Sequence, residues 1–179
     1  MLRRLPTRRT LVFLALLLVL SGCVGGAAPV SGGTSPGSDG SIPGGGTRSA
    51  YAAYLPNPQL TPGDTLDVTK ADICEPGYAT KVRNVPESVK NQAYQEYGIQ
   101  SHKAGEYEVD HLISLELGGS NSIRNLWPQS YSGEWNAHMK DKLEDKLHAL
   151  VCSGSLDLKT SQREISADWI TAYNKYVGR

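Results

Sequence analysis

The chain reads Glu-Val-Asp-His-Leu-Ile-Ser-Leu-Glu-Leu-Gly-Gly-Ser-Asn-Ser-Ile-Arg-Asn-Leu-Trp-Pro-Gln from Glu108 to Gln129. Its first part is apolar and strand-like, and it carries Asp110 and His111 side by side. The Gly-Gly pair predicts a turn, and Asn-Leu-Trp-Pro predicts the returning segment. A helix that carries His138 is expected to follow. The stretch therefore predicts a short hairpin packed beside one helix.

Four polar side chains of this region can form one site. Adjacent strand residues point to opposite faces, so Asp110 and His111 can act together only if the strand ends or bends there. The Gly-Gly turn indicates that it does, and it brings Asn125 back beside His111. One imidazole can activate water, an amide can hold that imidazole, and a carboxylate with the imidazole of His138 can hold a divalent cation. This combination is what metal-assisted phosphodiester hydrolysis needs.

The ordered set of Val-Asp-His, Leu-Gly-Gly, Asn-Leu and a later histidine with lysines behind it resembles the HNH endonucleases of the ββα-metal fold. The resemblance covers residues 108–142. It implies an α+β fold, in which a hairpin-helix core is surrounded by additional helices. It also implies that His111 is the general base, that Asn125 orients its ring, and that Asp110 and His138 bind the metal.

The resemblance further implies a divalent metal cofactor, with Mg²⁺ or Mn²⁺ favoured and Zn²⁺ or Ni²⁺ as alternatives. The expected substrate is nucleic acid, DNA rather than RNA, cleaved with little sequence preference. Two other functions stay open, namely a non-catalytic envelope lipoprotein that retains the scaffold and a phosphodiesterase for a different diester. No protein partner is evident.

The chain departs from the family pattern in two ways. The CxxC pairs that hold a structural zinc in many members are absent. The spacing from Asn125 to His138 is also longer than in compact members, which makes the amide of Asn136 an alternative metal ligand. We favour His138.

The N-terminal part predicts export. Residues 1–22 combine four arginines with an uninterrupted apolar run of ten residues, which is too short to span a bilayer and is typical of a signal peptide. Leu-Ser-Gly-Cys at residues 20–23 resembles a bacterial lipobox, which implies that Cys23 is lipidated. Residues 23–59 are expected to form a flexible Gly/Ser/Pro-rich tether, and 60–179 the nuclease domain. The predicted location is the cell envelope, with a lipid anchor to a membrane.

The formal net charge of zero hides an acidic mature chain. Four of the 18 Lys and Arg residues lie in the first nine positions, which leaves 14 against 18 Asp and Glu, a net charge of about −4. A protein that coats nucleic acid would be strongly basic, so this class is disfavoured. A nuclease whose positive charge is local or carried by a metal remains compatible.

Cys74 and Cys152 are the two cysteines that remain if Cys23 is lipidated. In an exported protein such a pair most simply forms a disulfide, and we expect one here. Two buried free thiols are the alternative. A zinc site is less favoured, because neither cysteine has a CxxC partner.

The remaining pattern is helical. Helices are expected over 85–98, from Trp135 to a stop at Gly154, and from a capping box at Ser161 to the C-terminus. The aromatic residues mostly keep helical core spacing, which favours packing over a base-stacking role. On the middle helix a set of polar residues is expected to form an ordinary solvated face: Lys140, Lys142, Lys146 and His148.

Overall fold

In the computed structural model, residues 51–178 are described, and they form an α+β domain. The signal peptide, Cys23 and most of the expected tether lie outside this range. Within it the helices are α1 (Lys70–Ile73), α2 (Tyr78–Val82), α3 (Glu87–Glu96), α4 (Ala137–Ser153), α5 (Leu158–Ala167) and α6 (Trp169–Tyr176). The two strands are β1 (Tyr107–His111) and β2 (Leu126–Ser130). Three 3-10 turns complete the fold: Ala52–Tyr54, Leu115–Leu117 and Ile123–Asn125.

The predicted hairpin is present as an antiparallel pair of strands. Asp110 lies opposite Trp127, and His111 lies opposite Leu126. β1 ends at His111, where the chain leaves the sheet for the loop of residues 112–125. A Cβ on Gly119 would lie 1.7 Å from the carbonyl oxygen of Ile113, so this loop closes tightly only with glycine at that position.

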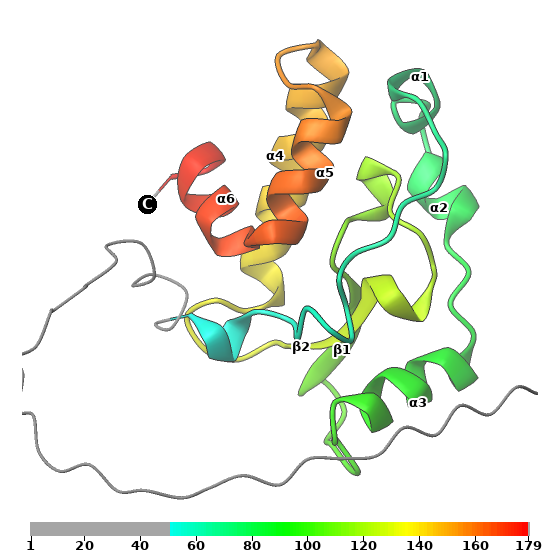
Figure 1. The fold of residues 1–179 in the computed structure, drawn as a ribbon, viewed down its shortest axis with the longest axis vertical. Coiled ribbons are helices and arrows are strands. Elements are labelled where there is room, and N and C mark those ends of the chain that lie inside the picture. Colours follow the sequence, from blue (N-terminus) through cyan, green and yellow to red (C-terminus); the bar gives the residue numbers. More distant parts are fainter. Residues whose placement is uncertain (1–50, 179) are drawn as a thin grey trace, which may run out of the picture. The chain divides into compact units, whose positions relative to one another are not determined.

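α4 follows the hairpin and forms the centre of the hydrophobic core. It begins two residues after the expected start at Trp135, because Asn136 caps it by accepting a hydrogen bond from the amide of Met139. It ends at Gly154, which has a φ of 82°. Its buried face packs against α5 and α6 (Figure 1). The core residues on these three helices are Leu143, Leu147, Val151, Leu158, Ile165, Trp169, Ile170, Ala172 and Tyr173.

The C-terminal helix of the sequence prediction is two helices. Asp157, rather than Ser161, caps α5 by accepting from the amide of Thr160, and the hydroxyl of Ser161 is buried and donates to Leu158. The chain then breaks at Asp168, whose carboxylate caps α6. An aspartate side chain that bonds nearby backbone amides can start a new helix and end the preceding one. The spacing of the apolar residues alone does not reveal this break.

The folded domain also starts before the expected boundary at residue 60. Tyr51, Tyr54 and Leu55 pack against the core, and the indole N–H of Trp169 donates to the carbonyl oxygen of Tyr54 at 3.0 Å. These residues were assigned to the tether because the Gly/Ser/Pro-rich composition ends without a sharp signal. The last part of that segment, from residue 51, therefore belongs to the domain.

α3 agrees with the prediction and lies on the hairpin. Pro86 precedes its first turn, and Gly98 follows its end with a φ of 72°. The helix packs against both strands (Figure 1). α4 reaches the hairpin through Lys140, whose ammonium contacts Asp110 and the carbonyl oxygen of His111. None of the helices within residues 51–178 has the length and apolar composition that a membrane span requires.

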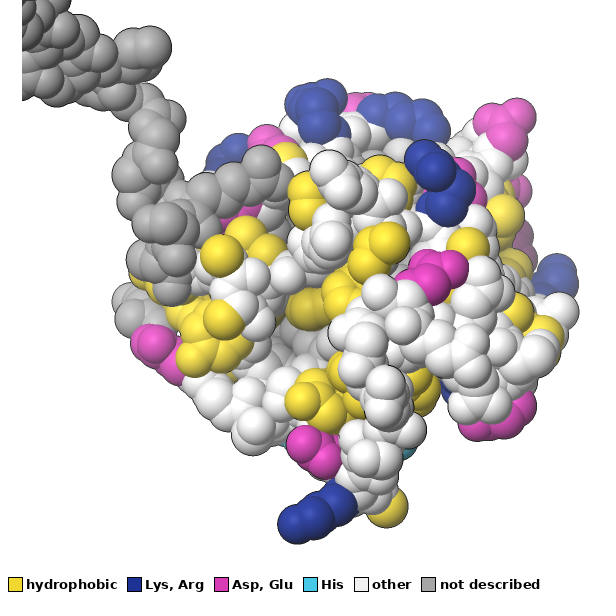
Figure 2. Space-filling model, turned by 60° about the horizontal axis from the view of Figure 1, so that its bottom comes forward, with side chains coloured by type: hydrophobic (Ala, Val, Ile, Leu, Met, Phe, Trp, Pro, Cys, Tyr) yellow, Lys and Arg dark blue, Asp and Glu magenta, His cyan; other side chains and the backbone are white. Residues whose placement is uncertain are grey.

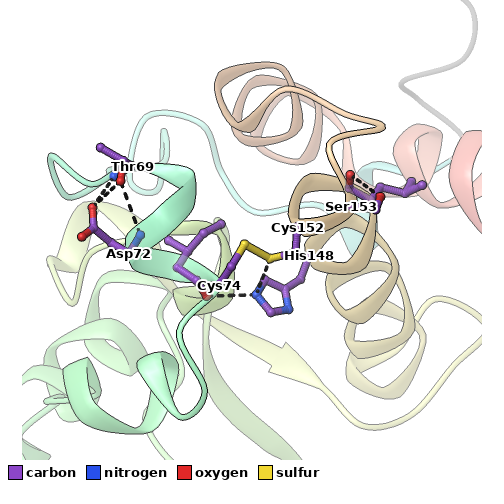
Figure 3. The surroundings of a disulfide bond; sticks show 8 residues. Thr69, Asp72, Cys74, His148, Cys152 and Ser153 are labelled. Carbon is purple, nitrogen blue, oxygen red and sulfur yellow. Dashed lines mark hydrogen bonds between the residues drawn. A yellow bond between two sulfur atoms is a disulfide. The ribbon is translucent and has the colours of Figure 1, made fainter.

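The predicted disulfide is confirmed. Cys74, at the end of α1, is bonded to Cys152 on α4, with a Cα–Cα distance of 5.7 Å (Figure 3). His148 lies beside this bond and is not solvated as expected. Its Nε2 is 3.0 Å from the carbonyl oxygen of Ile73 and 3.3 Å from Sγ of Cys152. The bridge ties the N-terminal segment to the central helix.

Candidate functional site

β1 presents its two key residues to different sides of the sheet. The carboxylate of Asp110 points toward α4, where it contacts Lys140. The ring of His111 lies on the other side and lines a groove next to α3. The strand alternation therefore holds up to the last strand residue, and the expectation that a bend brings Asp110 and His111 to one side is wrong.

His111 is held by Asn121, not by Asn125. Its Nε2 is 3.1 Å from Oδ1 of Asn121, whose Nδ2 donates to the carbonyl oxygen of Val82 at 2.9 Å. Because that bond fixes the amide, Oδ1 is the acceptor, so Nε2 carries the proton and Nδ1 keeps its lone pair. Burial lowers the pKa of His111, which favours the neutral ring. The ring thus has the tautomer and charge state of a base that acts through Nδ1.

Asn125 has a structural role. Its side chain is fully buried and makes hydrogen bonds to backbone groups of the 112–125 loop: it accepts from the amide of Ile113 at 2.9 Å and donates to the carbonyl oxygens of Ile113 and Ser120 at 3.0 and 2.9 Å. The amide of Asp64 also points to it, at 3.4 Å. The expectation that Asn125 orients the His111 ring is corrected, since its hydrogen bonds all go to the backbone.

Lys140 is the functional-site residue that the sequence prediction missed. It is not part of a solvated face, because its side chain is 0% exposed. Its ammonium donates to Oδ2 of Asp110 and to the carbonyl oxygen of His111, both at 2.7 Å, and to the carboxylate of Glu144. Three donors thus meet three acceptors. Burial alone would lower the pKa of Lys140, but the two carboxylates outweigh it and raise the pKa above its usual value.

Carboxylates outnumber cations around Lys140. Glu108, Asp110, Asp141 and Glu144 act on one another and on this single ammonium. Burial is the largest cause that raises the pKa of Glu108, of Asp141 and of Glu144. The α4 face of the hairpin therefore carries a surplus of negative charge, which favours a cation and repels a bare phosphate.

His138 and Asp110 are connected through Asp141 rather than directly. His138 is 68% exposed on the first turn of α4, and its Nδ1 lies 3.7 Å from Oδ2 of Asp141. Asp141 in turn interacts with Asp110, which raises its pKa. The alternative ligand, Asn136, uses Oδ1 to cap α4 and Nδ2 to donate to Gly133, so both of its polar atoms are engaged.

Asp110, Asp141 and His138 carry the kinds of ligand atom that bind a divalent cation, although these atoms are not close together. Two carboxylates and an imidazole are ligands that Mg²⁺, Mn²⁺ and the borderline metals accept. A different group has its ligand atoms close together. Within residues 51–178, the one set of three potential metal-binding side chains whose ligand atoms lie within 4.8 Å of one another is Cys74, His148 and Cys152. The disulfide consumes both of its thiolates, so it offers no thiolate ligands in this state.

No family model matches this chain, and no match was found among the curated proteins or the solved structures. The functional argument therefore depends on the residues and their geometry.

Proposed function

We propose that this chain is a metal-dependent endonuclease of the HNH type that hydrolyses phosphodiester bonds, DNA being the favoured substrate. The ββα-metal core would consist of β1, β2 and α4. One observation carries the proposal: a buried, neutral His111 with a free Nδ1 is the last residue of β1. Asp110 and its acidic cluster lie on the other side of the sheet, so the scissile phosphate would have to sit at the end of β1 to meet both groups.

His111 would act as the general base. Its Nδ1 would take a proton from the attacking water, while Asn121 keeps the Nε2–H in place. The charge of Asp110 stabilises the imidazolium that forms, whereas Arg83 and Lys140 oppose it. Burial is the largest effect on the ring and lowers the pKa of His111, so the ring is neutral and able to accept a proton. A base of this kind contributes roughly 10²- to 10⁴-fold in rate.

Asp110 and His138, with Asp141 between them, would hold a divalent cation. Lys140 contacts Asp110 through Oδ2, which leaves Oδ1 for such an ion. A bound cation would supply charge stabilisation at the phosphate and the leaving oxygen. Asp110 and Asp141 would provide its anionic ligands, and Glu108 would add to the negative field that attracts it.

We further propose that the domain is exported and lipid-anchored to the cell envelope through Cys23. The support is the basic and apolar pattern of residues 1–22, followed by Leu-Ser-Gly-Cys. A disulfide-bonded domain suits such a compartment.

A non-catalytic scaffold protein is the second candidate. The observation in its favour is that Lys140 already neutralises Asp110, the carboxylate that the metal would need. In this case the buried Lys140 would replace the cation permanently, and the domain would neither bind metal nor cleave.

Cleavage of plasmid DNA decides between the two. The full-length protein is stripped with a chelator, and Mg²⁺ or Mn²⁺ is then restored. We expect metal-restored nicking, with His111→Ala reduced by at least 100-fold. Because the ring is buried, thermal melting of the variant checks that it is folded at the assay temperature. RNA and a small phosphodiester run in parallel identify the substrate class. Absence of cleavage with every metal, together with no metal binding by calorimetry, would establish the scaffold reading instead.

A further inference from the structure

A groove beside His111 separates α3 from β1. It has a volume of about 480 Å³, and the residues that matter for its chemistry are Arg83, Lys90, Tyr94, His102, Tyr107 and His111. It lies on the side of the sheet opposite to Lys140 and Asp110, and Glu108 of the acidic cluster also lines it. The candidate base therefore forms part of its wall.

Three aromatic rings line this groove and face solvent. Tyr94 is stacked on His102 with ring centroids 4.2 Å apart and an interplanar angle of 28°, and Tyr107 meets His102 edge-on at 6.3 Å. His102 is exposed, and both tyrosines are half-buried. Core aromatics such as Trp135 and Trp169 are instead at most 2% exposed. The expectation that the aromatics serve packing is confirmed for the core, whereas these three rings are only partly covered.

The groove is lined by two cations, Arg83 and Lys90, and by two carboxylates, Glu87 and Glu108. Lys90 is 3.5 Å from Glu87, and Glu108 accepts a hydrogen bond from Tyr131. Arg83 is exposed and has no ion pair among residues 51–178, and its charge is one of the smaller causes that lower the pKa of His111. A free guanidinium beside a candidate base is suited to a phosphate group.

On the face shown in Figure 2, Lys and Arg side chains are interspersed with Asp and Glu, and neither sign forms a continuous surface. The groove itself offers a pair of stacked rings and one guanidinium, a combination suited to an exposed base and a phosphate.

We propose that this groove binds single-stranded nucleic acid, with an unpaired base stacked against the Tyr94–His102 pair and a backbone phosphate on Arg83. The inference rests on the proposed function and names its substrate class. In a duplex both faces of a base are covered by neighbours, so a paired base would first have to leave the stack. The groove therefore selects single strands, loops or frayed ends.

Equilibrium binding tests this without relying on cleavage. The full-length protein is titrated in chelator into three fluorescent 12-residue probes: oligodeoxythymidylate, the same length of duplex, and an abasic phosphate backbone. The single strand is expected to bind at least 5-fold more tightly than either of the other two, because each stacked base adds about 1–3 kcal/mol. An oligouridylate arm separates DNA from RNA.

Matched variants assign the two contacts. Tyr94→Leu removes the stacking ring and should weaken binding of the single strand by roughly 5- to 100-fold. Tyr94→Phe keeps the ring and should retain binding. His102→Ala, at an exposed position, gives the same test if Tyr94→Leu does not fold. Arg83→Gln should weaken the abasic probe as well and reduce the salt slope by about 0.7. Arg163→Gln, an exposed arginine on α5 outside the groove, should change neither.

The binding experiment can fail or succeed independently of the cleavage experiment. Single-strand binding without cleavage would support the groove and refute the hydrolase. Cleavage combined with equal binding of all three probes, with unchanged binding by Tyr94→Leu and His102→Ala, or with no binding at all, would overturn the groove and leave the hydrolase in place.

Discussion

Lys140 and Asp110 are joined by a 2.7 Å hydrogen bond between Nζ and Oδ2, which connects α4 to the end of β1. The same ammonium also bonds the carbonyl oxygen of His111. One buried cation therefore fixes both neighbours, the candidate ligand through its side chain and the candidate base through its backbone. The position of α4 along its axis therefore determines where Asp110 and the backbone of His111 lie.

Replacing Lys140 is expected to destabilise the fold. Lys140→Met leaves Asp110 and Glu144 without their partner, and removal of one member of a buried ion pair costs about 3–5 kcal/mol. Urea unfolding measures the loss. Lys142→Met, on the exposed side of the same helix, is the matched control and should change the free energy of unfolding by less than about 0.5 kcal/mol. A loss of similar size in both variants would show that the buried pair has no special role.

Much of the fold follows from local signals. Pro86 and Gly98 bound α3, Asn136 and Gly154 bound α4, and the cysteine pair predicts its bridge. The helix ends depend on residues close in sequence, and the disulfide prediction depends on there being two cysteines in the domain.

The errors concern long-range contacts. Lys140 stands among charged neighbours and looks solvated, and only the approach of β1 shows that it is buried. Asn121 is one of two loop amides that can reach His111, and its bond to Val82 selects it over Asn125. Sequence spacing gives the candidate set, but tertiary contacts assign the roles.

Loss of the disulfide is expected to destabilise the domain by about 4 kcal/mol, because the bond closes a loop across a sequence separation of 78 residues. The double variant Cys74→Ser, Cys152→Ser should melt at a lower temperature than the oxidised protein. The reduced wild type should match the variant. Equal melting of oxidised and reduced wild type would contradict this expectation.

Glu164 should make stability depend on pH. Its carboxylate accepts from Lys175 and from Tyr176 at 2.8–2.9 Å, and the hydrogen bond from Lys175 is the largest cause that lowers its pKa. The folded state therefore binds fewer protons than the unfolded state. The stabilisation is complete above the ordinary value of 4.5 and is lost as the pH falls through the lowered pKa.

The variant Glu164→Gln measures this contribution. At pH 7 it should be less stable than the wild type by about 0.5–1 kcal/mol, since the pair is partly exposed and screened. At pH 2.5 the difference should shrink toward zero. Glu75→Gln, at an exposed position, serves as the control. A difference that stays constant over this range would show that the ion pair is not its source.

The targeting proposal predicts that Cys23→Ser releases the protein from the membrane fraction or blocks its maturation. The thiol of Cys23 is the atom that a lipid would modify, and serine cannot replace it. Fractionation and mass spectrometry of the N-terminal peptide measure both effects. Wild-type protein without a fatty acid, or a serine variant that still carries one, would refute the proposal.

Two asparagine variants should separate positioning from folding. Asn121→Ala removes the hydrogen bond to His111 and those to Val82 and Asn84, and we expect kcat/KM to fall by about 10- to 100-fold, with a smaller loss of stability than Asn125→Ala because Asn121 is only partly buried. Asn125→Ala leaves buried backbone groups of Ile113 and Ser120 without partners and should cost about 2–4 kcal/mol in unfolding free energy. His111→Ala should lose cleavage by more than its loss of stability explains, and added imidazole should partly restore it. If Asn125→Ala is stable but inactive while Asn121→Ala cleaves normally, Asn125 is the residue that positions the base and our reassignment is wrong.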